Sequence, residues 1–340
     1  MCEVQNEVQN ASENVNKDKV PETLYHYCSL DTFYNIVKNK SIWLSDLSKT
    51  NDSQELVWLR KAIQKKLFPK IETNMREDKD NFWGWEFART FLNKEPPVVS
   101  CWGFCLSKKE DDLGQWRGYG DNGAGVAIGF KPLVEVKKDI LVSNASLVLG
   151  KIHYLENWDK KSDTEHEDQE LAELRRDACI IAKNRHDELL KFVNNSKAKH
   201  IPKIELTSEI EETIVMEMAA MTRFPFYKGT TFKEEEEWRI VFSLPKEIIP
   251  AEGLTKESLQ NLKDFQWPPE LERKPYEYIV RNHMLVSHFE MKVANMEDVI
   301  QSITIGPKAK VTEEDIKFFL KSNSVYNDSI KIEKSAASYR

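Results

Sequence analysis

The stretch VVSCWGFCL, residues 98–106, is apolar at nearly every position. A strand with one face in water alternates apolar and polar side chains. This unbroken run therefore predicts a strand that is covered on both faces, in the middle of a sheet. GVAIGF at 125–130 predicts a second strand of the same kind, and LVLGKIHYL at 147–155 predicts a third.

Upstream of this stretch, two short strands flank a helix. LYHYCSL at 24–30 and SIWLS at 41–45 have the composition of strands. Ser29 is placed to cap the helix between them. The apolar face of that helix would comprise Leu30, Phe33, Ile36 and Val37. A turn at 51–53 predicts the start of a further helix.

Downstream, strand signals return with EEEEWRIVFSL at 234–244. Thr312 is placed to cap a late helix. Further strands are expected at 276–280, 284–289 and 302–305, with SIKIE at 329–333 as a last one. Because strands come early and late with helices between them, the fold class is α+β. We expect a central mixed or antiparallel sheet with flanking helices.

The segment from about 159 to 222 differs in composition from the rest. Charge is dense in it, and no glycine occurs between Gly150 and Gly229. Apolar residues recur at helical spacing at Leu171, Leu174, Ala178 and Ile181. We therefore expect a charged helical insertion at about 159–222 within a single domain at 21–335, after a disordered polar tail at 1–20.

Composition limits the partners and the compartment. The net charge of −7 over 340 residues counts against a surface that coats nucleic acid. No stretch approaches the roughly 20 apolar residues of a membrane helix, and the start of the chain lacks the apolar core of a secretory signal. The five cysteines are scattered, which is typical of a reducing compartment. We expect a cytoplasmic protein with no membrane partner.

Tyr25, His26 and Tyr27 form the first candidate cluster. On a strand the two tyrosines face one side of the sheet and the histidine faces the other. His26 could donate hydrogen bonds to ligand hydroxyls, and the tyrosine rings could stack on a ligand. Taken alone, a core strand with a satisfied histidine is the favoured interpretation.

The segment DDLGQWRGYG, residues 111–120, brings amide, indole, guanidinium and phenol groups together between two predicted strands. These groups could grip a flat ring and a phosphate at once. A packed loop with Trp116 as core anchor is equally well supported. A neighbouring polar cluster, NDSQE at 51–55, is explained sufficiently by a turn that begins a helix.

The acidic run before Trp238 is the third cluster. Four glutamates in a row usually form a solvated face, but on a strand Glu235, Glu237 and Arg239 would share one side. A carboxylate at the start of a central strand, beside an arginine, can stabilise a cation that develops in a cleft. Glu237 is the central choice and Glu235 the alternative. No metal-site or serine-nucleophile motif occurs, so no metal is predicted.

In order along the chain, these segments resemble an uncharacterised, mainly bacterial family of domains of unknown function. That family combines an LYHY-like strand, an Asn-Asp turn, a Trp-x-x-Tyr segment, a Glu-x-Glu-Trp-Arg strand and a late Ile-Gly-Pro. Here they read LYHY, NDSQE, QWRGYGDNGAGVAIGF, EEEWR and ITIGP. The likeness runs from about Leu24 to Pro307 and implies no reaction.

The opening LYHYCSLDTFYNIVKNKSIWLS also resembles the start of ADP-ribosyltransferase-like folds. Those folds begin with a strand bearing His or Arg and place a catalytic Glu on a late strand. The resemblance implies NAD as substrate, with His26 on the nicotinamide-side ribose and Glu237 or Glu235 as the catalytic carboxylate. Ser100 and Tyr119 are both candidates for the middle residue of such a triad.

We therefore hypothesise an NAD-consuming, ADP-ribosyltransferase-like enzyme that modifies a macromolecule or hydrolyses NAD, as a bacterial toxin or antiphage effector would. The implied catalytic residues are His26, Tyr119, Glu235 and Glu237. The implied cofactor-binding residues are Tyr25, Tyr27, Gln115, Trp116, Arg117 and Arg239. The acidic surface favours a protein or small-molecule acceptor over a long nucleic acid. The alternative is a non-catalytic module that binds a nucleotide-like signal or a partner protein.

Overall fold

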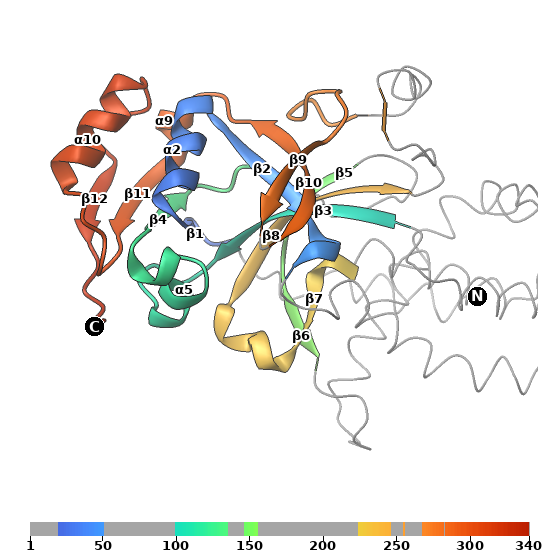
Figure 1. The fold of residues 1–340 in the computed structure, drawn as a ribbon, viewed down its shortest axis with the longest axis horizontal. Coiled ribbons are helices and arrows are strands. Elements are labelled where there is room, and N and C mark those ends of the chain that lie inside the picture. The colour runs from blue at the N-terminus through green and yellow to red at the C-terminus, as the bar shows by residue number, and fades with distance from the viewer. Residues whose placement is uncertain are drawn as a thin grey trace, which may run out of the picture. The chain divides into compact units, whose positions relative to one another are not determined.

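The computed structural model describes residues 20–50, 99–134, 146–155, 224–245, 254–255, 267–281 and 283–339. The chain divides into two compact units. All the described helices and strands lie in the unit formed by Glu22–Lys61, Glu95–Asp159 and Met221–Arg340 (Figure 1). The turn at 51–55 and the helical insertion predicted at about 159–222 lie outside the described residues, so the domain organisation stays a prediction.

A mixed sheet of ten strands forms the core of the described unit, which confirms the α+β fold class. Its order is β12-β11-β4-β1-β3-β2-β10-β9, with β8 pairing with β3 and β5. The pairs in this sheet are antiparallel except β11 with β12. The strands are β1 Leu24–Cys28, β2 Ser41–Asp46, β3 Val99–Ser107, β4 Val126–Phe130, β5 Ser146–Lys151, β8 Glu237–Pro245, β9 Glu277–Arg281, β10 Met284–Lys292, β11 Ile300–Ile305 and β12 Lys331–Lys334.

Strand β3 holds the sheet together. One of its edges pairs with β8 along the whole strand. Its other edge is shared, because β2 pairs at Trp102 and Gly103 while β1 pairs at Ser107. The sheet therefore divides at β3 into an arm that begins with β1 and an arm that begins with β2. Trp102, Phe104 and other apolar side chains of β3 are buried, which confirms the central strand predicted from the unbroken apolar run.

Two capped helices cover parts of the sheet. In α2 (Leu30–Asn39) the Ser29 side chain accepts a hydrogen bond from the Thr32 backbone, and Phe33 is among the buried residues. In α10 (Glu313–Ser322) Thr312 forms a capping box with Asp315. Both caps were predicted, and each satisfies backbone N–H groups that a helix start leaves unpaired. A four-residue helix, α9 (Met296–Val299), precedes β11.

Three predicted elements have different boundaries. The acidic run is not wholly a strand, because η5 (Thr230–Glu235) and a left-handed Glu236 precede β8, which begins at Glu237. The stretch 147–155 divides into β5 and β6 (His153–Leu155), and β6 pairs in parallel with β7 (Tyr227–Gly229) in a separate sheet. The segment read as a loop contains a short helix, α5 (Leu113–Gly118), which Asp112 caps. None of the described helices has the length and hydropathy to span a bilayer.

Candidate functional site

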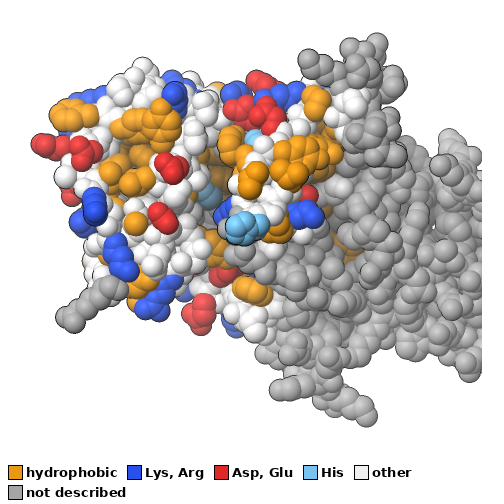
Figure 2. All heavy atoms as spheres, in the orientation of Figure 1, with side chains coloured by type: hydrophobic (Ala, Val, Ile, Leu, Met, Phe, Trp, Pro, Cys, Tyr) orange, Lys and Arg blue, Asp and Glu red, His pale blue; other side chains and the backbone are white. Residues whose placement is uncertain are grey.

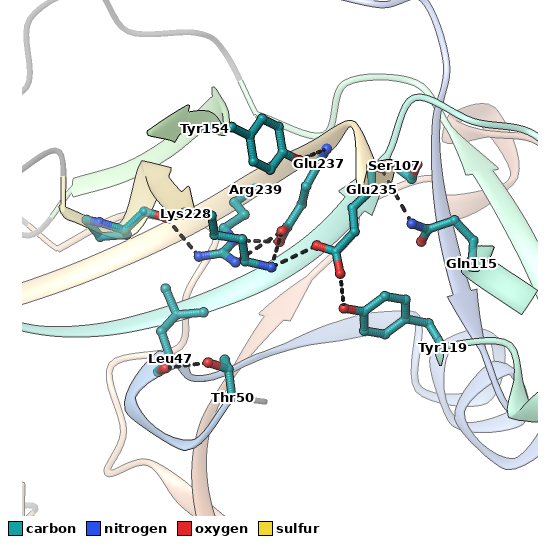
Figure 3. A network of polar contacts seen from close by, with 11 residues as sticks. Leu47, Thr50, Ser107, Gln115, Tyr119, Tyr154, Lys228, Glu235, Glu237 and Arg239 are labelled. Atoms are coloured by element: carbon teal, nitrogen blue, oxygen red, sulfur yellow. Dashed lines mark hydrogen bonds and ion pairs between the residues drawn. The ribbon is translucent and has the colours of Figure 1, made fainter. Parts of the chain in front are cut away.

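A network of paired charges lies at the start of β8 (Figure 3). Glu237 and Arg239 project from the same side of the strand and are buried. Arg239 Nε donates to Glu237 Oε1 at 2.5 Å and Nη2 donates to Oε2 at 3.1 Å, a two-bond contact that suits the planar guanidinium. Arg239 Nη1 also donates to the Pro225 carbonyl at 2.8 Å.

Lys228 of β7 joins this ion pair to a second carboxylate. Its Nζ lies 2.6 Å from Glu237 Oε2 and 2.9 Å from Glu235 Oε2. The parallel pairing of β6 with β7 places Lys228 opposite Tyr154, whose hydroxyl accepts the Glu237 backbone N–H at 2.9 Å. Among the described residues, two cations and two carboxylates therefore meet at one place, and their formal charges cancel.

Glu235 is the more accessible of the two carboxylates. The left-handed turn at Glu236 follows η5 and separates Glu235 from the strand. Its side chain is 17% exposed, against 6% for the side chain of Glu237. The Tyr119 hydroxyl donates to Glu235 Oε1 at 2.5 Å, and Ser107 Oγ donates to the Glu235 carbonyl at 2.8 Å. Tyr119 and Lys228 thus hold a carboxylate that solvent can still reach, and Ser107 holds the backbone of the same residue.

Burial and charge set the ionisation states. Burial alone would raise the pKa of Glu237, but the neighbouring charges of Arg239 and Lys228 outweigh it and hold that pKa below its usual value. Burial, the charge of Glu235 and the hydrogen bond to it raise the pKa of Tyr119. At neutral pH Glu237 is therefore an anion, and Tyr119 is a protonated phenol able to donate.

His26 does not join this network. The register pairs Tyr25 with Ser107 and Ser107 with Glu237, so the two tyrosines of β1 share a face of the sheet with Glu237. His26 lies on the other face, where its ring stacks on Phe104 at 4.1 Å and Nδ1 contacts the Cys105 carbonyl at 2.9 Å. Burial lowers the pKa of His26 to about 4. Of the catalytic residues implied by the resemblance, His26 therefore lies apart from Glu237 and Tyr119.

Most of the predicted ring-stacking residues pack into the core. Trp116 is fully buried, lies edge-on to Tyr27 at 4.8 Å and donates from Nε1 to Asp111 at 2.6 Å. The Tyr27 hydroxyl accepts from the Asp112 backbone and donates to the Lys109 carbonyl. Trp116 thus has the core-anchor role that was the alternative interpretation of this segment.

The remaining predicted residues are divided between the site and other places. Gln115 is buried and its side-chain amide lies 3.5 Å from the Glu235 carbonyl, at the rim of the network. Arg117 is exposed, and its guanidinium lies 5.2 Å from the Tyr339 ring. Tyr25 is partly buried on β1. Ser100 is at the opposite end of β3 from Ser107, so Tyr119 is the one of the two triad candidates that reaches a carboxylate.

Sequence reasoning missed Lys228 and Tyr154. Both lie in β6 and β7, short strands whose pairing joins segments that are far apart in the chain. No local motif marks Lys228, although a lysine directly after a run of aromatic residues, in FPFYKG, is an unusual position for a charge. Within the described ranges, no group of three or more His, Cys, Asp or Glu side chains is arranged to hold a metal ion.

Residues 115–240 match the family model described as Protein of unknown function (DUF2971). The DUF2971 range includes Gln115, Tyr119, Glu235, Glu237 and Arg239. The match supports the prediction of an uncharacterised family, while the signature motifs themselves stay predictions. Comparisons with curated proteins and with solved structures give no match.

Proposed function

We propose that this chain is an NAD-consuming, ADP-ribosyltransferase-like enzyme in which Glu235 is the carboxylate that meets the substrate. The observation that supports this role is the Glu235 side chain, held by Tyr119 and Lys228 yet partly open to solvent. A carboxylate fixed in this way is preorganised to stabilise positive charge that develops on a substrate, because its side chain needs little rearrangement. Glu237, which is buried against Arg239, would instead hold the start of β8 in position.

The reaction breaks the bond between nicotinamide and C1′ of the ribose. The bonding electrons leave with nicotinamide, and the ribose gains the character of an oxocarbenium cation, as in glycoside hydrolysis. Glu235 would accept a hydrogen bond from a hydroxyl of that ribose and stabilise the cation. A nucleophile on the acceptor, or water, then bonds to C1′ and gives up its proton. Loss of NAD or modification of an essential macromolecule would suit a toxin or an antiphage effector.

Of the residues expected to bind NAD, Gln115 and Arg117 remain the best placed. Arg239 is engaged with Glu237, so Arg117, exposed on α5, is the better candidate for the pyrophosphate. Gln115 lies next to Glu235 and could contact the nicotinamide-side ribose. A protein acceptor remains the favoured partner because of the net charge of −7.

A non-catalytic module is the second candidate function, and one observation favours it. Both carboxylates and both cations of the network already have partners within the chain, so the network is satisfied without a ligand. Such a network can serve stability alone. In that case the same surface would bind a nucleotide-like signal or a protein without chemistry.

Nicotinamide release from NAD separates the two functions. The wild-type chain is expected to release nicotinamide, and Glu235→Gln, which keeps the size of the side chain, is expected to slow release by about 100-fold or more. Glu234→Gln is the matched control, because Glu234 is the preceding residue and its side chain is 97% exposed. Absence of release, together with no effect of NAD on the melting temperature, would contradict the proposal. NAD binding without release would favour the module.

A further inference from the structure

Strand β9 ends the described sheet. Among the described strands it pairs with β10 alone, so its outer edge presents backbone N–H and C=O groups that no described strand uses. Natural proteins usually protect such edges with charges, bulges or prolines, because an open edge can pair with another chain. The sequence of β9 is EYIVR, and four of its five residues are exposed.

The hairpin of β9 and β10 also exposes a hydrophobic face. Tyr278 is 58% exposed, Val280 78% and Leu285 65%. The register places Val280 opposite Leu285, so these three side chains share one face of the hairpin. Figure 2 shows hydrophobic side chains gathered over this part of the molecule. Apolar side chains beside an open edge are typical of an interaction surface rather than of a protected edge.

The order of residues in β9 is self-complementary. Glu277 and Arg281 stand two positions on either side of Ile279. In an antiparallel pair of two β9 strands centred on Ile279, Glu277 of each copy lies opposite Arg281 of the other. Tyr278 then lies opposite Val280, an aromatic and β-branched pair of the kind that stabilises neighbouring strands. Other antiparallel registers separate the opposite charges.

We propose that two copies of this chain pair antiparallel through β9, about Ile279. Arg281 is exposed and makes no ion pair in the part of the chain that the structure describes. Glu277 contacts Lys274 at 3.0 Å, but its side chain is 60% exposed and has room for a second donor. Leu285 flanks the Tyr278–Val280 pairs on both copies. A contact of this size is small, so the dimer should be weak and concentration-dependent.

Sedimentation velocity of the full chain, from about 1 to 100 μM, tests the pairing. The wild type is expected to shift from monomer towards dimer over that range. Arg281→Glu or Glu277→Arg alone places like charges opposite one another, and each should weaken association about tenfold. The double variant Glu277→Arg/Arg281→Glu restores two opposite-charge pairs with their positions exchanged. It should return association to within about threefold of the wild type.

Val280→Lys gives an independent test at a position that the fold leaves exposed. It should weaken association without altering the charge pairs, while the melting temperature of each variant reports that the chain is folded. A wild type that stays monomeric to about 100 μM would overturn the proposal. So would single reversals that leave association unchanged, or a double variant that fails to restore it.

Discussion

Glu235 and Glu237 are two positions apart and share the ammonium group of Lys228, yet they occupy different environments. Glu237 is buried and bound in two places by Arg239. Glu235 is partly exposed and is held by the phenol of Tyr119. Two residues of the same type therefore differ in role because of burial. The buried carboxylate can stabilise the fold, and the partly exposed one is accessible to a ligand. The left-handed residue between them, Glu236, makes this separation.

Removing the buried carboxylate should have the largest effect on stability. Glu237→Gln leaves the Arg239 guanidinium buried without its anion, and breaking a buried pair in this way costs about 3–5 kcal/mol of unfolding free energy. Urea unfolding at pH 7 measures the cost, with Glu235→Gln as the control. A loss below about 1 kcal/mol would show that the pair is not structural.

The buried carboxylate should also make stability depend on acid. The folded-state pKa of Glu237 is lowered, so its contribution is present above its unfolded value of about 4.5 and is lost as the pH falls towards the folded value. Unfolding free energies of the wild type and Glu237→Gln should therefore approach each other as the pH falls from about 4.5 to about 2. Parallel curves for the two proteins would contradict the assignment.

His26 should contribute a separate pH dependence from the other face of the sheet. Its pKa is about 4 in the folded chain and 6.5 in the unfolded chain, so between these values only the unfolded chain binds the proton. Stability should fall as the pH drops from about 6.5 to about 4, by at most about 3 kcal/mol. His26→Gln should remove this part of the pH dependence of the unfolding free energy. An unchanged pH dependence in that variant would contradict the prediction.

Loss of the Tyr119 hydroxyl should have the smallest effect on stability. Tyr119→Phe removes one hydrogen bond to a partly exposed carboxylate, so we expect a change in unfolding free energy below about 1 kcal/mol. Nicotinamide release should fall more than this change in stability can explain, because Glu235 loses one of the groups that orient it. Equal rates of nicotinamide release by Tyr119→Phe and the wild type would show that Tyr119 has no role in the reaction.

Local patterns predicted the parts of the fold that local physics determines. Ser29 and the spacing of Phe33 and Ile36 specify helix α2, and the unbroken apolar run specifies β3 as a central strand. The alternation of β1 also placed His26 on the face opposite Tyr25 and Tyr27. The alternation within β1 does not predict which residues of other strands lie on each face, because that depends on the register between distant segments.

The site was harder to predict than the fold because its decisive contacts are long-range. Four consecutive glutamates carry no signal that the chain turns at Glu236, so Glu235 and Glu237 were assigned to one strand. Lys228 enters through the pairing of β6 with β7. Trp116 was a candidate for ligand binding but is buried in the core. The local sequence is compatible with either role, because an aromatic residue among polar ones can anchor a core or stack on a ligand.

The contrast between the two glutamates is tested most directly by measuring nicotinamide release and unfolding free energy together for Glu235→Gln. We expect release to fall by about 100-fold or more while the unfolding free energy stays within about 1 kcal/mol of the wild type. Release that persists in a folded Glu235→Gln variant, or that declines only in proportion to the unfolded fraction, would contradict it.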